Sequence, residues 1–142
     1  MAINTGKVVT GGLAAGLVMN VCDYVNGTYI MAAAYKAELD ALNPALMPKM
    51  EGTSTVVAFI VLDFVFGLFL VWTYAAIRPR FGAGAGTAIK AGLLNWAISA
   101  MTWYFTVAMG MFSFGFWIKS ACIALVITLL GAYVGAMLYK EE

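Results

Sequence analysis

The sequence predicts an all-α protein: a membrane-embedded antiparallel four-helix bundle that forms one domain over residues 1–142. The first observation is composition, because 63% of the residues are hydrophobic and only 11% are charged, whereas soluble domains average about 25% charged residues. The second is a set of four long apolar segments joined by short links. The third is a stripe of small or polar residues along each segment. Lipid accepts such segments as helices, which satisfy their own backbone hydrogen bonds.

The four expected spans are similar in length, at roughly 23 to 28 residues each. At 1.5 Å per residue, each is long enough to cross a hydrocarbon core of about 30 Å. Asn20, Asp23 and Asn26 interrupt the first apolar run, so we expect a retained span and not a cleaved signal peptide. The spans cover about residues 7–34, 53–77, 87–111 and 117–139.

The ends of these spans follow from local signals. Thr5 is the expected N-cap of the first helix. Asn43-Pro44 is expected to end the helical pattern that follows the first span, because the residue before proline avoids the helical region. The sequence Arg78-Pro79-Arg80-Phe81 is expected to end the second span, and the glycine-rich residues 82–87 are expected to form a flexible link.

Orientation follows from the distribution of lysine and arginine. Four spans place both termini and the second link on one side of the membrane. That side carries Lys7, Arg78, Arg80, Lys90 and Lys140, and the other carries Lys36, Lys49 and Lys119. The positive-inside rule then places both termini in the cytoplasm.

Each expected span carries one face of small or polar residues, placed at 100° per residue. These faces are Gly12, Gly16, Asn20, Asp23 and Gly27; Val56, Asp63, Gly67, Leu70 and Tyr74; Gly92, Asn95, Ser99, Thr102 and Thr106; and Ala121, Ala124, Thr128, Gly131 and Gly135. Helices in lipid associate through small residues that allow close approach and through polar pairs. We therefore expect helix packing at Gly12, Gly16, Gly27, Gly67, Gly131 and Gly135.

Two acids lie inside the apolar segments, in a repeated pattern V-x-D-aromatic-V-x-G-x-aromatic around Asp23 and Asp63. Because the first two spans run in opposite directions, the two carboxyls are expected at similar depth, and at least one is expected to hold a proton. One hypothesis is a proton or cation site formed with Asn20 and Asn95. The alternative is that a protonated aspartate hydrogen-bonds between helices and holds them together.

The sequence lacks the residues that several functional classes require. The chain has no histidine, and Cys22 and Cys122 are isolated, so we expect neither a metal nor a cofactor. Pairs of a nucleophile and a base are also missing, which argues against an enzyme. The net charge of +1 provides no field for nucleic acid.

A glycine-rich segment before the third span, with basic residues around it, imitates an anion-binding loop. The strand that a dinucleotide-binding or P-loop motif requires is missing. A simpler hypothesis is that Arg78, Arg80 and Lys90 contact an anionic lipid headgroup at the inner interface.

The run over residues 72–93, with the block Arg78-Pro79-Arg80-Phe81-Gly82, resembles small bacterial four-span integral membrane proteins of uncharacterised function. The resemblance implies a multi-pass protein of the bacterial inner membrane. It implies no activity and no catalytic residue.

The functional expectation is a small polytopic membrane protein that acts as a non-enzymatic accessory or structural subunit of a larger complex or homo-oligomer. Its partners would be the lipid bilayer and other membrane subunits, or further copies of itself. The alternative is a small permease, or a proton or cation pathway, that uses a paired site at Asp23 and Asp63.

Overall fold

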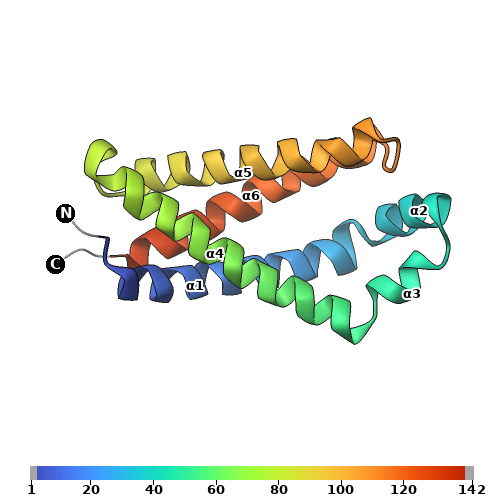
Figure 1. The fold of residues 1–142 in the computed structure, drawn as a ribbon, viewed down its shortest axis with the longest axis horizontal. Coiled ribbons are helices and arrows are strands. Elements are labelled where there is room, and N and C mark those ends of the chain that lie inside the picture. The colour runs from blue at the N-terminus through green and yellow to red at the C-terminus, as the bar shows by residue number, and fades with distance from the viewer. Residues whose placement is uncertain (1–2, 140–142) are drawn as a thin grey trace.

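The computed structural model describes residues 3–139, and these residues form only helices, turns and short links. The helices are α1 (Thr5–Val25), the π-helical segment η1 (Asn26–Ile30), α2 (Ala32–Leu42), α3 (Leu46–Met50), α4 (Thr53–Phe81), α5 (Ala85–Ala108) and α6 (Phe114–Leu138). The prediction of an all-helical chain is thereby confirmed. Figure 1 shows α1, α4, α5 and α6 running along the long axis of the molecule. The start of α1 and the end of α6 lie at one end, and α2 and α3 lie at the other.

Three helices in the described part of the chain are long and apolar enough to cross a membrane: Thr5–Ile30, α4 and α6. Their presence indicates a membrane protein. The helix α5 has a similar length, 24 residues, but it does not reach the same apolar character because several polar side chains interrupt it.

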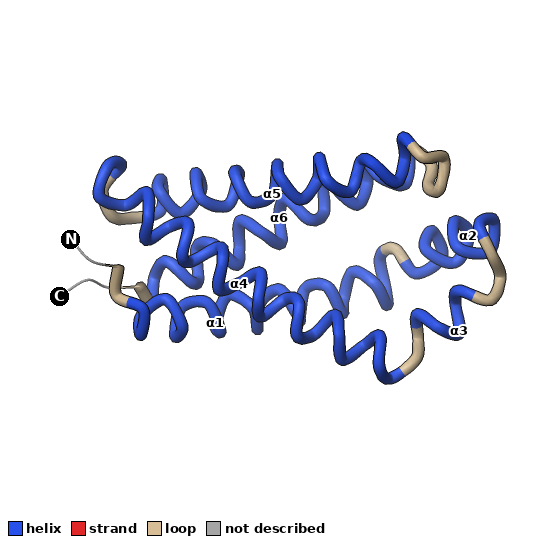
Figure 2. The backbone as a smooth tube through the Cα atoms, in the orientation of Figure 1, coloured by secondary structure: helices blue, strands red, loops and turns tan. Residues whose placement is uncertain are grey.

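The first span is less regular than the sequence suggests. Asn4 is the N-cap instead of Thr5, and its side-chain oxygen accepts a hydrogen bond of 3.1 Å from the backbone N–H of Lys7. At Asn26 the helix changes to π geometry, with the Met31 N–H donating to the Asn26 carbonyl at 2.8 Å. The helical path then breaks at Met31 (φ −109°, ψ 1°), so the expected continuous helix over 7–34 is interrupted. The tube in Figure 2 shows this break as a short loop before α2.

The end of α4 also differs from the expectation. The helix continues through Pro79 to Phe81 instead of ending near residue 77. A proline in the last turn removes one N–H donor, and few helical bonds remain to be lost there. The helix ends at Gly82, whose N–H donates to the Arg78 carbonyl at 2.8 Å and whose φ of 82° favours glycine.

The expected flexible link over 82–87 is a tight turn, because α5 already begins at Ala85. The N–H of Gly84 donates to the hydroxyl of Tyr74 at 3.1 Å. The hydroxyl of Thr87 donates to the Gly82 carbonyl at 2.7 Å. These bonds join the turn to the body of α4, so its geometry is fixed by hydrogen bonds as well as by glycine.

The helices α1 and α4 make the most extensive contact in the molecule, and glycines lie at its centre. A Cβ atom added at Gly16 would lie 2.7 Å from the Cα atom of Phe64, and one at Gly12 would lie 2.7 Å from the Cα atom of Leu68. A Cβ atom at Gly67 would overlap the backbone of both Gly12 and Gly16. The two backbones are therefore in direct contact, a contact that only glycine allows.

The contact between α1 and α6 is built in the same way. A Cβ atom at Gly131 would lie 3.1 Å from the Cγ atom of Met19, and one at Gly135 would lie 3.1 Å from the Gly11 carbonyl oxygen. Gly11, which the sequence analysis did not single out, would place a Cβ atom 2.6 Å from the Gly135 carbonyl oxygen.

Gly27 does not have the expected packing role, because a Cβ atom there would meet nothing within 4 Å.

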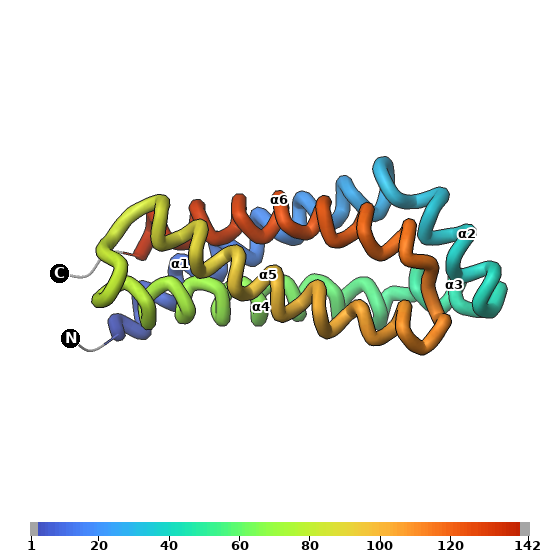
Figure 3. Tube along the Cα trace, turned by 90° about the horizontal axis from the view of Figure 1, so that it is seen from above, coloured from blue at the N-terminus to red at the C-terminus, as the bar shows by residue number. Residues whose placement is uncertain are grey.

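The buried core has two clusters. The smaller consists of Met19, Leu70, Ile127 and Ala132, and the larger lies toward the end of the molecule that holds the start of α1 and the end of α6. The larger cluster consists of Val8, Ala15, Val71, Tyr74, Ala75, Ala88, Ala91 and Tyr139. The rings of Tyr74 and Tyr139 meet edge to face with their centres 5.9 Å apart. Figure 3, turned by 90° from Figure 1, shows α5 and α6 side by side along the length of the molecule.

At the far end, α2 is attached to the beginning of α6. The carboxylate of Glu38 accepts a hydrogen bond of 2.9 Å from the N–H of Ser113 and another from its hydroxyl. Ser113 is itself the N-cap of α6 and accepts from the N–H of Phe116 at 3.2 Å. The rings of Tyr35 and Phe116 pack edge to face at 5.0 Å. The short helix α2 is therefore held across this end of the molecule.

We predict that Gly67→Ala destabilises the protein by about 2 kcal/mol or more, because the added methyl group forces α4 away from α1. The matched control is Gly86→Ala in α5, where a Cβ atom meets nothing within 4 Å. There we expect a gain of roughly 0.5–1 kcal/mol, because alanine is the better helix former. Unfolding in mixed micelles by added dodecyl sulfate measures both. Equal effects of the two substitutions would contradict the proposed backbone contact.

Candidate functional site

A cavity of about 410 Å³ lies among the four long helices. All four contribute to its wall, which consists of Met19, Asp23, Leu62, Asp63, Val65, Phe66, Phe69, Ser99, Ala124, Ile127 and Thr128. Asp23 is exposed and Asp63 is half-buried, so the cavity is open to the surface. Each long helix thus provides one polar side chain, and the other seven lining residues are apolar.

The glycine contact between α1 and α4 determines where the two acids lie. An added Cβ atom at Gly16 would lie 3.1 Å from the carbonyl oxygen of Asp63, so Asp63 lies directly at the crossing of the two helices. Asp23 follows Gly16 by seven residues, which is about two helical turns. Met19, between them on α1, is buried and also lines the cavity. The packing of the two backbones thereby brings both carboxyls to one cavity.

Neither carboxyl has a hydrogen-bond or ion-pair partner among the described residues. No hydrogen bond or ion pair joins Asp23 or Asp63 to any residue in the range 3–139, where the ion pair that does occur joins Lys36 to Asp40. No lysine or arginine lines the cavity. A charged side chain within a membrane is costly unless it is paired or hydrated, so these two groups have unmet capacity for a proton or a cation.

Thr128 adds a third polar group without a partner. Its side chain is only 4% exposed, yet its hydroxyl makes no hydrogen bond to another described residue. Other hydroxyls in the long helices bond to carbonyls of their own helix: Thr73 to Phe69, Ser99 to Asn95 and Thr102 to Ile98. Thr128 lies at the cavity wall, where a ligand can supply a partner for its hydroxyl.

The two asparagines assigned to the site from the sequence lie elsewhere. Asn20 and Asn95 are not among the residues that line the cavity. The amide of Asn20 donates to the Gly16 carbonyl at 3.0 Å and, across to α4, to the Ile60 carbonyl at 3.3 Å. The amide of Asn95 donates within α5 to the Ala91 carbonyl at 2.9 Å. Asn20 therefore holds two helices together.

From the sequence, Ser99 is expected only as one of the donors near the two acids, and Thr128 is not connected with the site. Ser99 and Thr128 do lie on the small and polar faces that the helical repeat predicts, and this was the available signal. The apolar wall, with Met19, Phe66 and Phe69, carries no comparable signal, because apolar residues in a span are found on every face.

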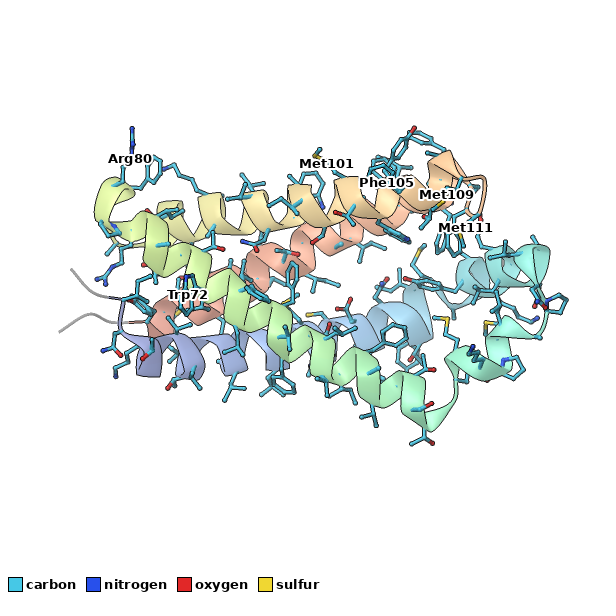
Figure 4. The ribbon with its side chains drawn as sticks, viewed as in Figure 1. Trp72, Arg80, Met101, Phe105, Met109 and Met111 are labelled. Atoms are coloured by element: carbon cyan, nitrogen blue, oxygen red, sulfur yellow. The ribbon has the colours of Figure 1, made fainter. Side chains whose placement is uncertain are left out.

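The three basic residues expected at a lipid headgroup lie around the turn between α4 and α5. The Cζ atom of Arg78 lies 5.6 Å from the centre of the Tyr139 ring, and the Nζ atom of Lys90 lies 5.0 Å from that of the Phe81 ring. Arg80 is exposed and points away from the other helices (Figure 4). Two of the three cations are thus held over aromatic faces, an arrangement that favours them electrostatically.

The described residues contain no group of three or more His, Cys, Asp and Glu side chains that is placed to hold a metal ion. Cys22 and Cys122 are both free. Comparisons with protein-family models, with curated proteins and with solved structures find no match.

We predict that Asn20→Ala destabilises the folded protein by about 0.6 to 1.7 kcal/mol, which are the average and the maximum measured for hydrogen bonds between membrane helices. The matched control is Asn95→Ala, which removes a bond within one helix and is expected to cost less. Unfolding in mixed micelles compares them. A larger loss for Asn95→Ala than for Asn20→Ala would contradict the assignment of Asn20 as the link between α1 and α4.

Proposed function

We propose that this protein is a small membrane permease or ion pathway whose cavity binds a proton or a small cation at Asp23 and Asp63. One observation carries the proposal: two carboxyls and the hydroxyl of Thr128 line one cavity without a hydrogen-bond or ion-pair partner in the described chain. If the carboxyls only held helices together, they would be bonded to a neighbouring helix. Asn20 makes that kind of bond instead.

We further propose that the chain crosses the membrane four times, as an antiparallel four-helix bundle with α5 as the additional span. A helix of 24 residues is about 36 Å long, enough to cross the hydrocarbon core. The polar side chains that lower its apolar character donate to backbone carbonyls of α5 itself, which reduces their cost in lipid. These are Asn95, Ser99, Thr102 and Thr106.

The proposed location is the bacterial inner membrane, with both termini in the cytoplasm, as the resemblance of residues 72–93 and the positive-inside rule suggest. Lys7, Arg78, Arg80 and Lys90 lie toward the end where α1 and α5 start and α4 ends (Figure 1). Lys140, which also entered the charge count, lies outside the described residues. Anionic headgroups at this face would contact Arg80 and Lys90, with Arg78 close to the same turn.

An accessory or structural subunit, or a homo-oligomer, is the second candidate function. It is favoured by a strongly exposed apolar surface on the outer side of α5 and on the turn that follows, shown in Figure 4. Met101 is 71% exposed, and Phe105 and Met109 are each 67% exposed. Methionine-rich surfaces adapt to varied partners. This candidate predicts co-purification with other membrane subunits, or with further copies of the chain, at a fixed ratio.

We predict that the purified full chain in liposomes carries proton or cation flux, and that Asp23→Asn and Asp63→Asn each lower the flux by at least about tenfold. Each substitution keeps the side-chain shape but removes the charge that a cation requires. A pH-sensitive dye inside the liposomes and a driving K⁺ gradient with valinomycin measure the flux. The control is Asp40→Asn in α2, outside the cavity. Wild-type liposomes that leak no faster than empty ones would contradict the proposal.

A further inference from the structure

We propose that the cavity takes a small organic cation: a primary amine that carries an apolar, aromatic-sized group. This inference rests on the proposed function and names the class of ligand for the same site. It follows from the composition of the wall, in which a few acceptor groups face a predominantly apolar surface.

The apolar part of the wall argues against a bare metal ion as the ligand that fills the cavity. Seven of the eleven lining residues are apolar: Met19, Leu62, Val65, Phe66, Phe69, Ala124 and Ile127. Hard cations such as Ca²⁺ and Mg²⁺ take six or more oxygen ligands around them. An alkyl or aryl group instead gains from contact with such a wall, because its apolar surface leaves water.

The polar part of the wall matches an ammonium group. A primary ammonium carries one positive charge and three N–H donors, as the lysine side chain does. Asp23 and Asp63 supply carboxylate acceptors, and the hydroxyl of Thr128 is free to accept a third hydrogen bond. The hydroxyl of Ser99 donates to the Asn95 carbonyl, which leaves its oxygen able to accept as well. One ammonium group would thereby give partners to groups that have none within the described chain.

The aromatic and sulfur groups match the remainder of such a ligand. Phe66 and Phe69 come from α4, one turn apart, and Phe69 is 64% exposed. Aromatic faces attract cations and stack with other rings, and the flexible thioether of Met19 fills irregular gaps. The volume of about 410 Å³ lies within the range of pockets that hold small molecules.

The test is isothermal titration of the purified full chain in nanodiscs with 2-phenylethylamine at neutral pH, where the amine is protonated. Propylbenzene, a neutral analogue of the same shape, and sodium chloride are the comparison ligands. We expect saturable binding of the amine, and at least about tenfold weaker binding for Asp23→Asn and for Asp63→Asn, because each removes a charged acceptor. Propylbenzene should show no dependence on either aspartate.

Substitutions at two uncharged residues of the wall test whether the cavity binds an organic ligand. They leave both acids in place. Thr128→Val keeps the shape of the side chain and should weaken amine binding about threefold or more, because the ammonium loses an acceptor. Its control is Thr102→Val, outside the cavity. Phe69→Ala should also weaken amine binding, because the apolar group of the ligand loses a contact with the wall.

The outcomes distinguish this inference from the proposed function. Flux that depends on Asp23 and Asp63, together with no saturable amine binding, overturns the organic-cation inference and leaves the proposed ion pathway standing. Amine binding that is equal in the wild type and in both Asp→Asn variants also overturns the inference. Absence of both flux and amine binding overturns both proposals. Amine binding that is lost with either aspartate and weakened by Thr128→Val supports the inference.

Discussion

The direct contact between the backbones of α1 and α4 is the constraint on which the rest of the structure depends. Gly12, Gly16 and Gly67 lie where a single methyl group would meet the backbone of the other helix. In lipid the hydrophobic effect does not drive helices together, so such close packing and the hydrogen bond from Asn20 must hold this pair. The position of the crossing then decides which side chains of the two helices meet.

The cavity lies beside the glycine contact between α1 and α4. Around the crossing the helices touch, and Met19 of α1 and Phe66 of α4 line the cavity beside it. The acids lie at this boundary, Asp63 at the crossing and Asp23 two turns beyond it along α1. Asp63 is half-buried there, and Asp23 is exposed where the cavity opens to the surface. The same packing that stabilises the fold therefore leaves two acids available for binding.

The features that depend on local residue patterns were predictable from the sequence. Composition and periodicity predicted the all-helical chain, and the spacing of glycines predicted contacts at Gly12, Gly16 and Gly67. Three features depend on tertiary structure and were not predictable from local pattern: the π-helical turn at Asn26, the continuation of α4 through Pro79, and the apolar wall of the cavity. The pair of acids could be inferred from their similar depth, whereas the asparagines assigned to them bond to backbone carbonyls instead.

The most direct test of this account is cross-linking of the two acid positions within one chain. In a background with Cys22→Ala and Cys122→Ala, the pair Asp23→Cys and Asp63→Cys is treated in native membranes with a short bis-methanethiosulfonate reagent. Because both positions line one cavity, the account predicts rapid intramolecular cross-linking. The control pair, Asp23→Cys with Val61→Cys, uses a position on α4 that is exposed and outside the cavity, and it should react far more slowly. Equal rates for the two pairs, or no link between positions 23 and 63, would contradict the account.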